Sequence, residues 1–142
     1  MPIGFRLATV PALKPTVRWL MPPGTIENSV RDVYGDPSKI TPELIERYRD
    51  MALRAGNREA LFVRFEQSPI GALADEVKQV TQPTLILWGL KDQLIPPAHV
   101  DRFLADIPGS RAVRFEGLGH VPQEEDPAAT LAPVKAFLGL TS

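Results

Sequence analysis

Residues 84–89, TLILWG, form a continuous apolar run of strand length that a proline precedes and a glycine ends. Such a run, without alternating polar residues, is typical of a strand that is buried on both faces. A helical pattern follows over residues 97–107, then a second strand-like run over 112–117 and a last helical pattern over 126–138. Strand, helix, strand and helix at this spacing predict two parallel strands joined by a right-handed crossover. The fold class expected for this part of the chain is therefore α/β.

The part of the chain before these strands has a different pattern. Residues 1–80 contain helical patterns separated by prolines and no convincing strand. Thr-Pro-Glu at 41–43 predicts a helix start, because a hydroxyl caps free N–H groups, proline fits the first turn and an acid interacts favourably with the helix dipole. Asn57 predicts the start of a further helix. We therefore expect a helical region over 1–80 and an α/β region over 81–142.

Composition limits the partners that the chain is expected to bind. Its 142 residues, 44% hydrophobic and 23% charged, are those of an ordinary globular domain. A net charge of −1 with scattered Lys and Arg does not indicate nucleic-acid binding, and the longest apolar stretch, 85–90, is too short to span a bilayer. The sequence shows no secretory leader and no cysteine. We therefore expect a cytoplasmic protein without disulfides, a thiol nucleophile or thiolate metal sites.

A polar residue follows each of the two expected strands. Asp92 lies in GLKDQLIP and His120 lies in GLGHVP. Functional groups gather at the carboxyl ends of parallel strands, and neighbouring strands lie about 4.8 Å apart, so we expect the two side chains within hydrogen-bond distance or bridged by one water. A carboxylate that accepts the imidazole Nδ1–H fixes the tautomer and supports proton uptake at Nε2. The pair predicts a general base oriented by an acid; the alternatives are a solvated loop histidine and an aspartate that caps a turn.

The same residues resemble a known family. PTLILWGLKDQLIP, followed by GLGHVPQEEDP, resembles the last two strand–loop units of an α/β-hydrolase, with W-G-x-x-D-x-x-x-P and then G-H-x-P-x-x-E-x-P. The stretch VYGDPSKITPELIERYRDMALRAGNREAL resembles the lid that such enzymes insert before the acid-bearing strand. The resemblance implies a helical lid over 1–80 and the last two parallel strand–helix units of the hydrolase core over 81–142. It also implies that Asp92 and His120 are the acid and the histidine of a catalytic triad.

The third member of that triad, a nucleophile that precedes the acid, is missing. Serines occur at positions 29, 38, 68, 110 and 142, and none lies in a G-x-S-x-G elbow. The sequence also has no G-x-D-x-G elbow and no oxyanion loop of the HG type. These features belong to the N-terminal half of the family, so we expect Met1 to be an internal or downstream start, or an engineered boundary. The chain alone is expected to be inactive.

For the complete enzyme, the resemblance implies cleavage of an ester-like or carbon–carbon bond in a small, fairly apolar substrate, without a metal or an organic cofactor. Epoxide or haloalkane hydrolysis is an alternative in the same class, because it uses the same histidine with an aspartate nucleophile. A non-catalytic interaction module derived from this fold is the alternative from another class, and it needs no nucleophile.

Other residues have weaker assignments. Glu125 is expected to be a helix-start acid or to support the catalytic pair, and His99 to be a surface residue. For the two phenylalanines among the substrate-site candidates, packing between helices is the preferred interpretation. Four residues are candidates to line a substrate site under the lid: Trp19, Met21, Phe62 and Phe65.

The expected sheet is small. A sheet of two strands is marginal on its own, and the edge of the strand at 84–89 invites pairing with another chain. We therefore expect the chain to associate with a missing N-terminal half or with a second copy of itself. Neither nucleic acid nor a membrane is expected as a partner.

Overall fold

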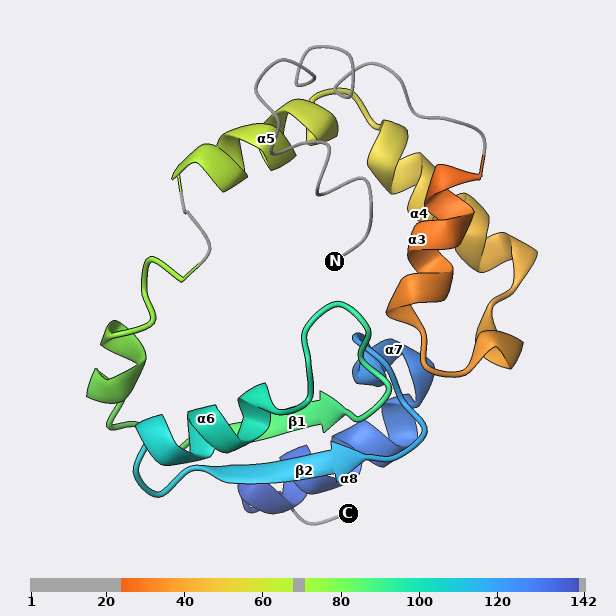
Figure 1. Ribbon diagram of the computed structural model, residues 1–142. Coiled ribbons are helices and arrows are strands. Elements are labelled where there is room, and N and C mark those ends of the chain that lie inside the picture. The colour runs from red at the N-terminus through yellow and green to blue at the C-terminus, as the bar shows by residue number, and fades with distance from the viewer. Residues whose placement is uncertain (1–23, 68–70, 141–142) are drawn as a thin grey trace. The chain divides into compact units, whose positions relative to one another are not determined.

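The computed structural model describes residues 24–67 and 71–140 (Figure 1). The chain divides into two compact units. Residues 24–32 and the described part of 40–72 belong to the first unit, and residues 33–39 and 73–140 belong to the second. The segment 33–39 is thus part of the second unit, although it lies between two helices of the first in the sequence.

The described sheet of the second unit has two parallel strands, β1 (Leu85–Gly89) and β2 (Arg111–Phe115). Leu85 lies opposite Arg111, and Gly89 lies opposite Phe115, so the strands pair along their full length. The β-branched and aromatic residues of the two strands, among them Ile86, Trp88 and Val113, favour the extended backbone, and proline and glycine limit its length. The α/β fold class is confirmed, and both strands lie within two residues of the predicted bounds.

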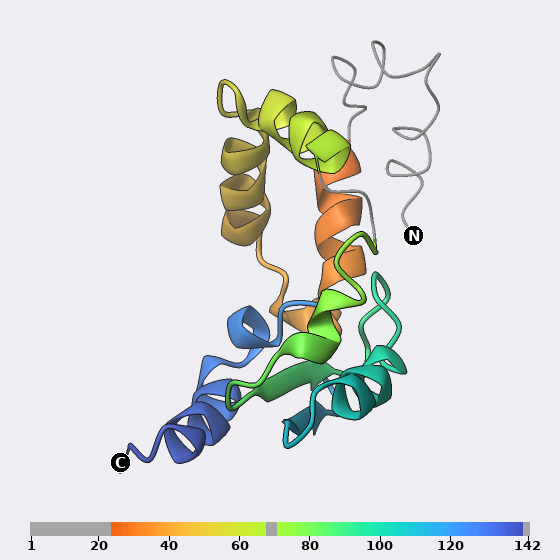
Figure 2. The ribbon, with the colours of Figure 1, turned by 90° about the vertical axis from the view of Figure 1, so that its left-hand side faces the viewer.

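Two helices cover opposite faces of this sheet (Figures 1 and 2). Helix α6 (His99–Asp106) connects the two strands and lies on one face. Helix α8 (Pro127–Phe137), which follows the short α7 (Pro122–Glu125), lies on the other. The rings of Trp88 in β1 and Phe103 in α6 have centroids 6.0 Å apart, a favourable aromatic contact. The helices predicted after each strand are therefore present, and α6 packs on β1 through an aromatic pair.

Strand β1 is less buried than its apolar sequence predicts. Its first four residues are partly exposed, and only Gly89 is buried. A strand inside a wide sheet has neighbours at both edges as well as helices on both faces. Among the described residues, β1 pairs with β2 alone. The sequence of β1 is therefore that of a strand in a wider sheet than the described residues form.

Asp126 separates α7 from α8. Its carboxylate accepts the Ala129 N–H at 2.9 Å, and Pro127 occupies the first helical turn. A capping acid followed by proline is a strong helix start, which confirms the predicted start of the last helix. A short 3₁₀ helix, η3 (Glu76–Gln79), precedes β1 and contacts α6.

The described part of the first unit is helical. It contains most of α3 (Thr25–Val33), together with α4 (Pro42–Leu53) and α5 (Asn57–Gln67), and the last two contact each other. Gly56 between them has a φ of 86°, in the left-handed region that glycine adopts without strain. In the described ranges no helix has the length and apolar character needed to cross a bilayer.

Thr41 caps helix α4 as predicted. Its hydroxyl accepts the Leu44 N–H at 3.2 Å, and its own backbone is extended. The pKa of Glu43 is lowered, first because its carboxylate accepts its own backbone N–H and then because of its hydrogen bond with Thr41. The cap therefore stabilises both the free N–H groups and the ionised acid of the first turn.

We expect Thr41→Ala to destabilise the chain by about 1 kcal/mol, because it removes the N-cap acceptor. It should also raise the pKa of Glu43 towards its ordinary value. A carboxyl group whose pKa is lowered by folding contributes stability above its unfolded pKa and loses it as the pH falls through the folded value. The Glu43 part of the effect should therefore be present at neutral pH and disappear in acid. Urea unfolding and a carboxyl NMR titration measure both effects, and Thr81→Ala, at an exposed threonine outside any helix, is the control that should change neither.

Candidate active site

Asp92 is held in a tight turn after β1. Its backbone N–H bonds to the Gly89 carbonyl at 3.2 Å. One carboxylate oxygen, Oδ1, accepts the N–H groups of Leu94 and Ile95 at 2.8 and 2.9 Å. Asp and Asn side chains favour such turns because they can replace a backbone acceptor. The turn uses Oδ1 and leaves Oδ2 for another partner.

That partner is His120. Its Nδ1 lies 2.9 Å from Asp92 Oδ2, across the loops that follow the two adjacent strands. The Asp92 side chain is only 4% exposed, whereas the His120 side chain is 32% exposed. The predicted distance between the two side chains is confirmed, and their catalytic role stays a prediction.

The geometry of this pair suits proton transfer. When Nδ1 carries the proton, the Asp92 carboxylate accepts it, and the lone pair at Nε2 is then available to take a proton from a reacting group. Within the described part of the chain, no hydrogen-bond partner is found at Nε2, and the ring is partly open to solvent. The Asp92 carboxylate is therefore held in place, while His120 Nε2 is available to a reacting group.

The loop of His120 packs against the end of β1 through backbone atoms. A Cβ atom on Gly89 would collide with the carbonyl oxygens of Leu118 and Gly119. The Lys91 N–H also donates to the Leu118 carbonyl at 2.9 Å. Only glycine at position 89 allows the two loops to approach this closely, and this approach brings Asp92 and His120 together.

The segment 33–39 also packs against the His120 loop. The His120 N–H donates to the Val33 carbonyl at 2.8 Å. A Cβ atom on Gly119 would lie 2.5 Å from both Gly35 N and Val33 O. The sequence pattern gave no indication of this contact, because the segment lies more than 80 residues before the histidine.

Glu125 holds this segment in place. The residue is 6% exposed, and its carboxylate accepts the N–H groups of Gly35 and Asp36 at 2.9 and 3.1 Å and that of Gly119 at 2.5 Å. The expected supporting role of Glu125 agrees with this position, but its partners were not predicted. The acid in G-H-x-P-x-x-E-x-P was the only signal for it in the sequence.

The segment also carries an ionised acid. The hydrogen bonds from the Ser38 hydroxyl and from its backbone N–H lower the pKa of Asp36, and the positive charges of Lys39 and Lys91 act in the same direction. Lys39 in turn donates to the Glu125 carbonyl oxygen at 2.7 Å. The segment beside the His120 loop is therefore polar and held by several hydrogen bonds.

No described serine is hydrogen-bonded to His120. The Ser38 hydroxyl donates to Asp36 at 2.7 Å, and Ser29 lies within α3. Ser110 precedes β2, at the opposite end of the strand from the His120 loop. The described residues thus hold an acid and a base but no hydroxyl nucleophile bonded to that base.

The side chains of all four predicted substrate-site residues lie outside the part of the chain that the structure describes. Trp19 and Met21 lie outside the described residues. Phe62 and Phe65 lie within α5, but their side chains are likewise outside the described part. The assignment of Trp19, Met21, Phe62 and Phe65 to a substrate site therefore stays a prediction.

His99, expected at the surface, begins α6 and is partly exposed.

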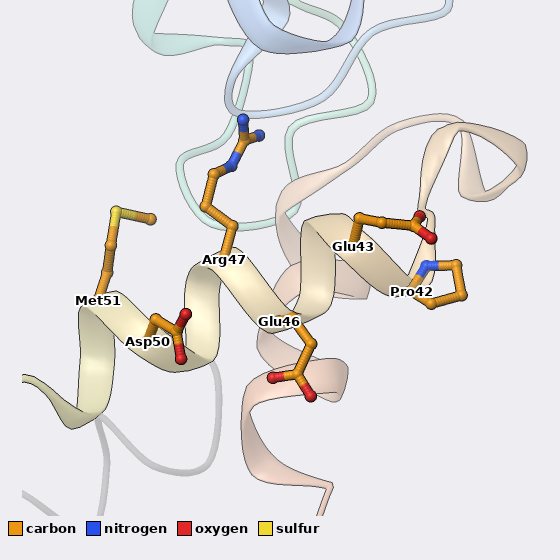
Figure 3. Close-up of a pocket in the computed structure, with 6 residues that line it drawn as sticks. All are labelled: Pro42, Glu43, Glu46, Arg47, Asp50 and Met51. Atoms are coloured by element: carbon orange, nitrogen blue, oxygen red, sulfur yellow. The ribbon is translucent and has the colours of Figure 1, made fainter.

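A hollow lies along one side of α4 in the first unit (Figure 3). Sites for small molecules are usually concave and enclosed by several elements. A single helix forms this hollow and four of its residues are charged, so we do not assign it to substrate binding. Its lining residues all belong to α4: Pro42, Glu43, Glu46, Arg47, Asp50 and Met51.

Comparison with known proteins gives consistent matches. The model of the alpha/beta hydrolase family matches residues 1–134. YugF of Bacillus subtilis (strain 168), described as an uncharacterized hydrolase, is 32% identical over 125 residues, which cover 85% of this chain and 44% of that protein. Lipase 1 of Psychrobacter immobilis is 34% identical over 87 residues, which cover 59% of this chain and 27% of the lipase.

Solved structures give the same result. A mutant of the meta-cleavage product hydrolase CumD, from Pseudomonas fluorescens IP01, superimposes with a TM-score of 0.74 at 25% identity. The match covers 89% of this chain and 49% of the hydrolase. The chain thus spans less than half the length of each of these three relatives. Because the family model matches nearly the whole sequence and the fold agrees, the chain belongs to the alpha/beta hydrolase family.

Proposed function

We propose that this chain supplies the acid and the base of a hydrolase active site that cleaves an ester-like or carbon–carbon bond in a small, fairly apolar substrate. The observation that carries the proposal is the hydrogen bond of 2.9 Å between His120 Nδ1 and Asp92 Oδ2. The names of the relatives support the reaction class, since they include a lipase and a meta-cleavage product hydrolase.

In the proposed mechanism, His120 is the general base. Its Nε2 takes the proton from the nucleophile during attack and then returns it to the leaving group or activates water. Asp92 orients the ring and stabilises the imidazolium that forms. The nucleophile and the oxyanion donors come from residues outside those described. The helical region over 1–80, without the segment 33–39 and residues 73–80 that belong to the second unit, acts as the lid, and Trp19, Met21, Phe62 and Phe65 contact the substrate there.

The second candidate is a non-catalytic interaction module. The observation that favours it is that no described serine is bonded to His120. A module without catalysis, however, has no chemical reason to keep one Asp92 oxygen directed at His120 while the other holds the turn. We therefore prefer the hydrolase, and the nucleophile in it is either a serine or, for an epoxide or haloalkane substrate, an aspartate.

The test uses two proteins. The first is the 142-residue chain alone, which should not hydrolyse p-nitrophenyl esters, because its sequence has neither a G-x-S-x-G elbow nor an oxyanion loop of the HG type. The second is a fusion in which the nucleophile-bearing half of an active esterase of this family precedes Met1. Turnover by the fusion is the expected result. A folded but inactive fusion would contradict the proposal, as would turnover by the chain alone.

We further propose that the free edge of β1 binds a partner strand. β1 pairs with β2 alone among the described residues, and its apolar residues are partly exposed. Unpaired N–H and C=O groups at a sheet edge are a template for another strand. The preferred partner is the N-terminal half of the hydrolase fold, and a second copy of the chain takes its place when that half is absent.

The 142-residue chain alone is therefore expected to associate with itself. Light scattering over a tenfold range of concentration should give a mass that rises above that of the monomer. Joining the N-terminal half in the fusion should cover the edge and reduce the association. A mass that stays at 15.7 kDa throughout, without binding of an apolar dye, would contradict this prediction.

A further inference from the structure

We infer that Glu125 is a positioning residue for His120: its carboxylate joins the backbone before the histidine to the segment 33–39 and so holds the imidazole against Asp92. The inference deepens the proposed function and rests on it for its catalytic meaning. The contacts themselves, however, can be tested in the chain alone.

The contacts lie on both sides of one backbone hydrogen bond. The His120 N–H donates to the Val33 carbonyl at 2.8 Å. Gly119, one residue before the histidine, donates its N–H to Glu125 Oε1. Gly35 and Asp36, which follow Val33 closely, donate theirs to Glu125 Oε2. The Glu125 side chain therefore holds both backbone segments that this hydrogen bond connects.

The chemistry of the site suits an ionised carboxylate. All three partners are N–H donors, and each carboxylate oxygen faces at least one of them. Hydrogen bonds to a charged acceptor are about twice as strong as neutral ones. The residue is also 6% exposed, so water cannot readily replace a lost contact. Loss of the charge should therefore loosen the His120 loop rather than leave it unchanged.

The neighbouring acid provides a matched comparison. Glu124 is exposed, and its carboxylate accepts the Tyr34 hydroxyl at 3.1 Å. This bond also reaches the segment 33–39, but through a side chain and not through the backbone that His120 contacts. The same substitution at 124 and at 125 thus separates a general loss of negative charge on α7 from the loss of the backbone contacts.

The experiment measures the tautomer of His120 in the 142-residue chain by long-range nitrogen–proton NMR. The chain has two histidines, so His99 is an internal reference. The Nδ1–H tautomer should predominate at His120, because the other tautomer offers Asp92 no proton. In Glu125→Gln, the ratio of the Nδ1–H to the Nε2–H tautomer should fall by roughly tenfold, about 1.4 kcal/mol, the scale of one lost hydrogen bond. In Glu124→Gln it should stay unchanged.

A second variant keeps the test decisive. Glu125→Asp retains the charge but is one methylene shorter, so it should keep some contacts and give an intermediate ratio. An unchanged ratio in a folded Glu125→Gln protein overturns the inference. If Glu125→Gln does not fold, the Glu125→Asp protein decides in the same way. If neither variant folds, Glu125 serves stability alone, and the inference is also overturned.

Activity distinguishes this inference from the proposed function. In the active fusion, Glu125→Gln should lower kcat and leave KM unchanged, because the affected group acts on the proton and not on substrate binding. If the unmodified fusion is inactive, the proposed function fails, whereas the tautomer measurement still decides the positioning role.

Discussion

Replacement of His120 by alanine in the active fusion is expected to lower kcat for p-nitrophenyl ester hydrolysis by at least about 10⁴-fold. His120 is the general base of the proposed mechanism, and without it the nucleophile keeps its proton. Its ring is 32% exposed, so its removal should not destabilise the chain greatly. The control is His99→Ala, which removes the only other histidine and should keep full activity.

Asp92→Asn provides the complementary test. The amide oxygen of asparagine can still accept the N–H groups of Leu94 and Ile95, so the turn should remain. The amide nitrogen would then face His120 Nδ1 and require the tautomer with the proton on Nε2, which cannot act as a base. We expect a loss of about 10⁴-fold in kcat without unfolding. Activity that survives either substitution would mean that the 2.9 Å pair is not the catalytic pair.

Replacement of Gly89 by alanine is expected to lower the free energy of unfolding by about 3 kcal/mol or more. The added Cβ would collide with the carbonyl oxygens of Leu118 and Gly119, and these are backbone atoms that cannot rotate away. The two loops must then separate, which should also break the hydrogen bond between Asp92 and His120. Urea unfolding measures the first effect, and the tautomer of His120 measures the second.

Gly117→Ala is the matched control for this substitution. Gly117 lies two residues before Gly119 in the same loop, is exposed, and has no atom near the position of a Cβ. Its replacement should change the free energy of unfolding by no more than about 0.5 kcal/mol. An equal loss of unfolding free energy at positions 89 and 117 would show that the effect at Gly89 does not come from the close approach of the two backbones.

Local features of this protein were predictable because their causes are local. The caps at Thr41 and Asp126 depend on residues three positions apart, and both are present. The alternation of strands and helices over 84–138 depends on apolar periodicity, and it was confirmed within a few residues at each end. The position of Asp92 and His120 after the two strands was therefore already determined by the sequence.

The burial of β1 was not predictable from its composition. TLILWG indicates a strand buried on both faces, yet four of the five residues of β1 are partly exposed. Burial depends on which strands are present beside it, and the described residues supply only β2. The apolar sequence therefore predicts that the strand favours burial, and the neighbouring strands determine how much of it is buried.

The sequence by itself determined the order of the two strands and of the helices that follow them, the caps at Thr41 and Asp126, and the two loops that carry Asp92 and His120. Only the tertiary structure decided that the segment 33–39 lies against the His120 loop and that Glu125 joins them. The physical reason is that the segment 33–39 takes part through backbone groups, which bond to a carboxylate 90 residues later and to the His120 N–H. Every residue but proline carries the same N–H and C=O groups. Their pairing leaves no pattern in the side chains except the glycines, which permit the close approach, and one buried acid.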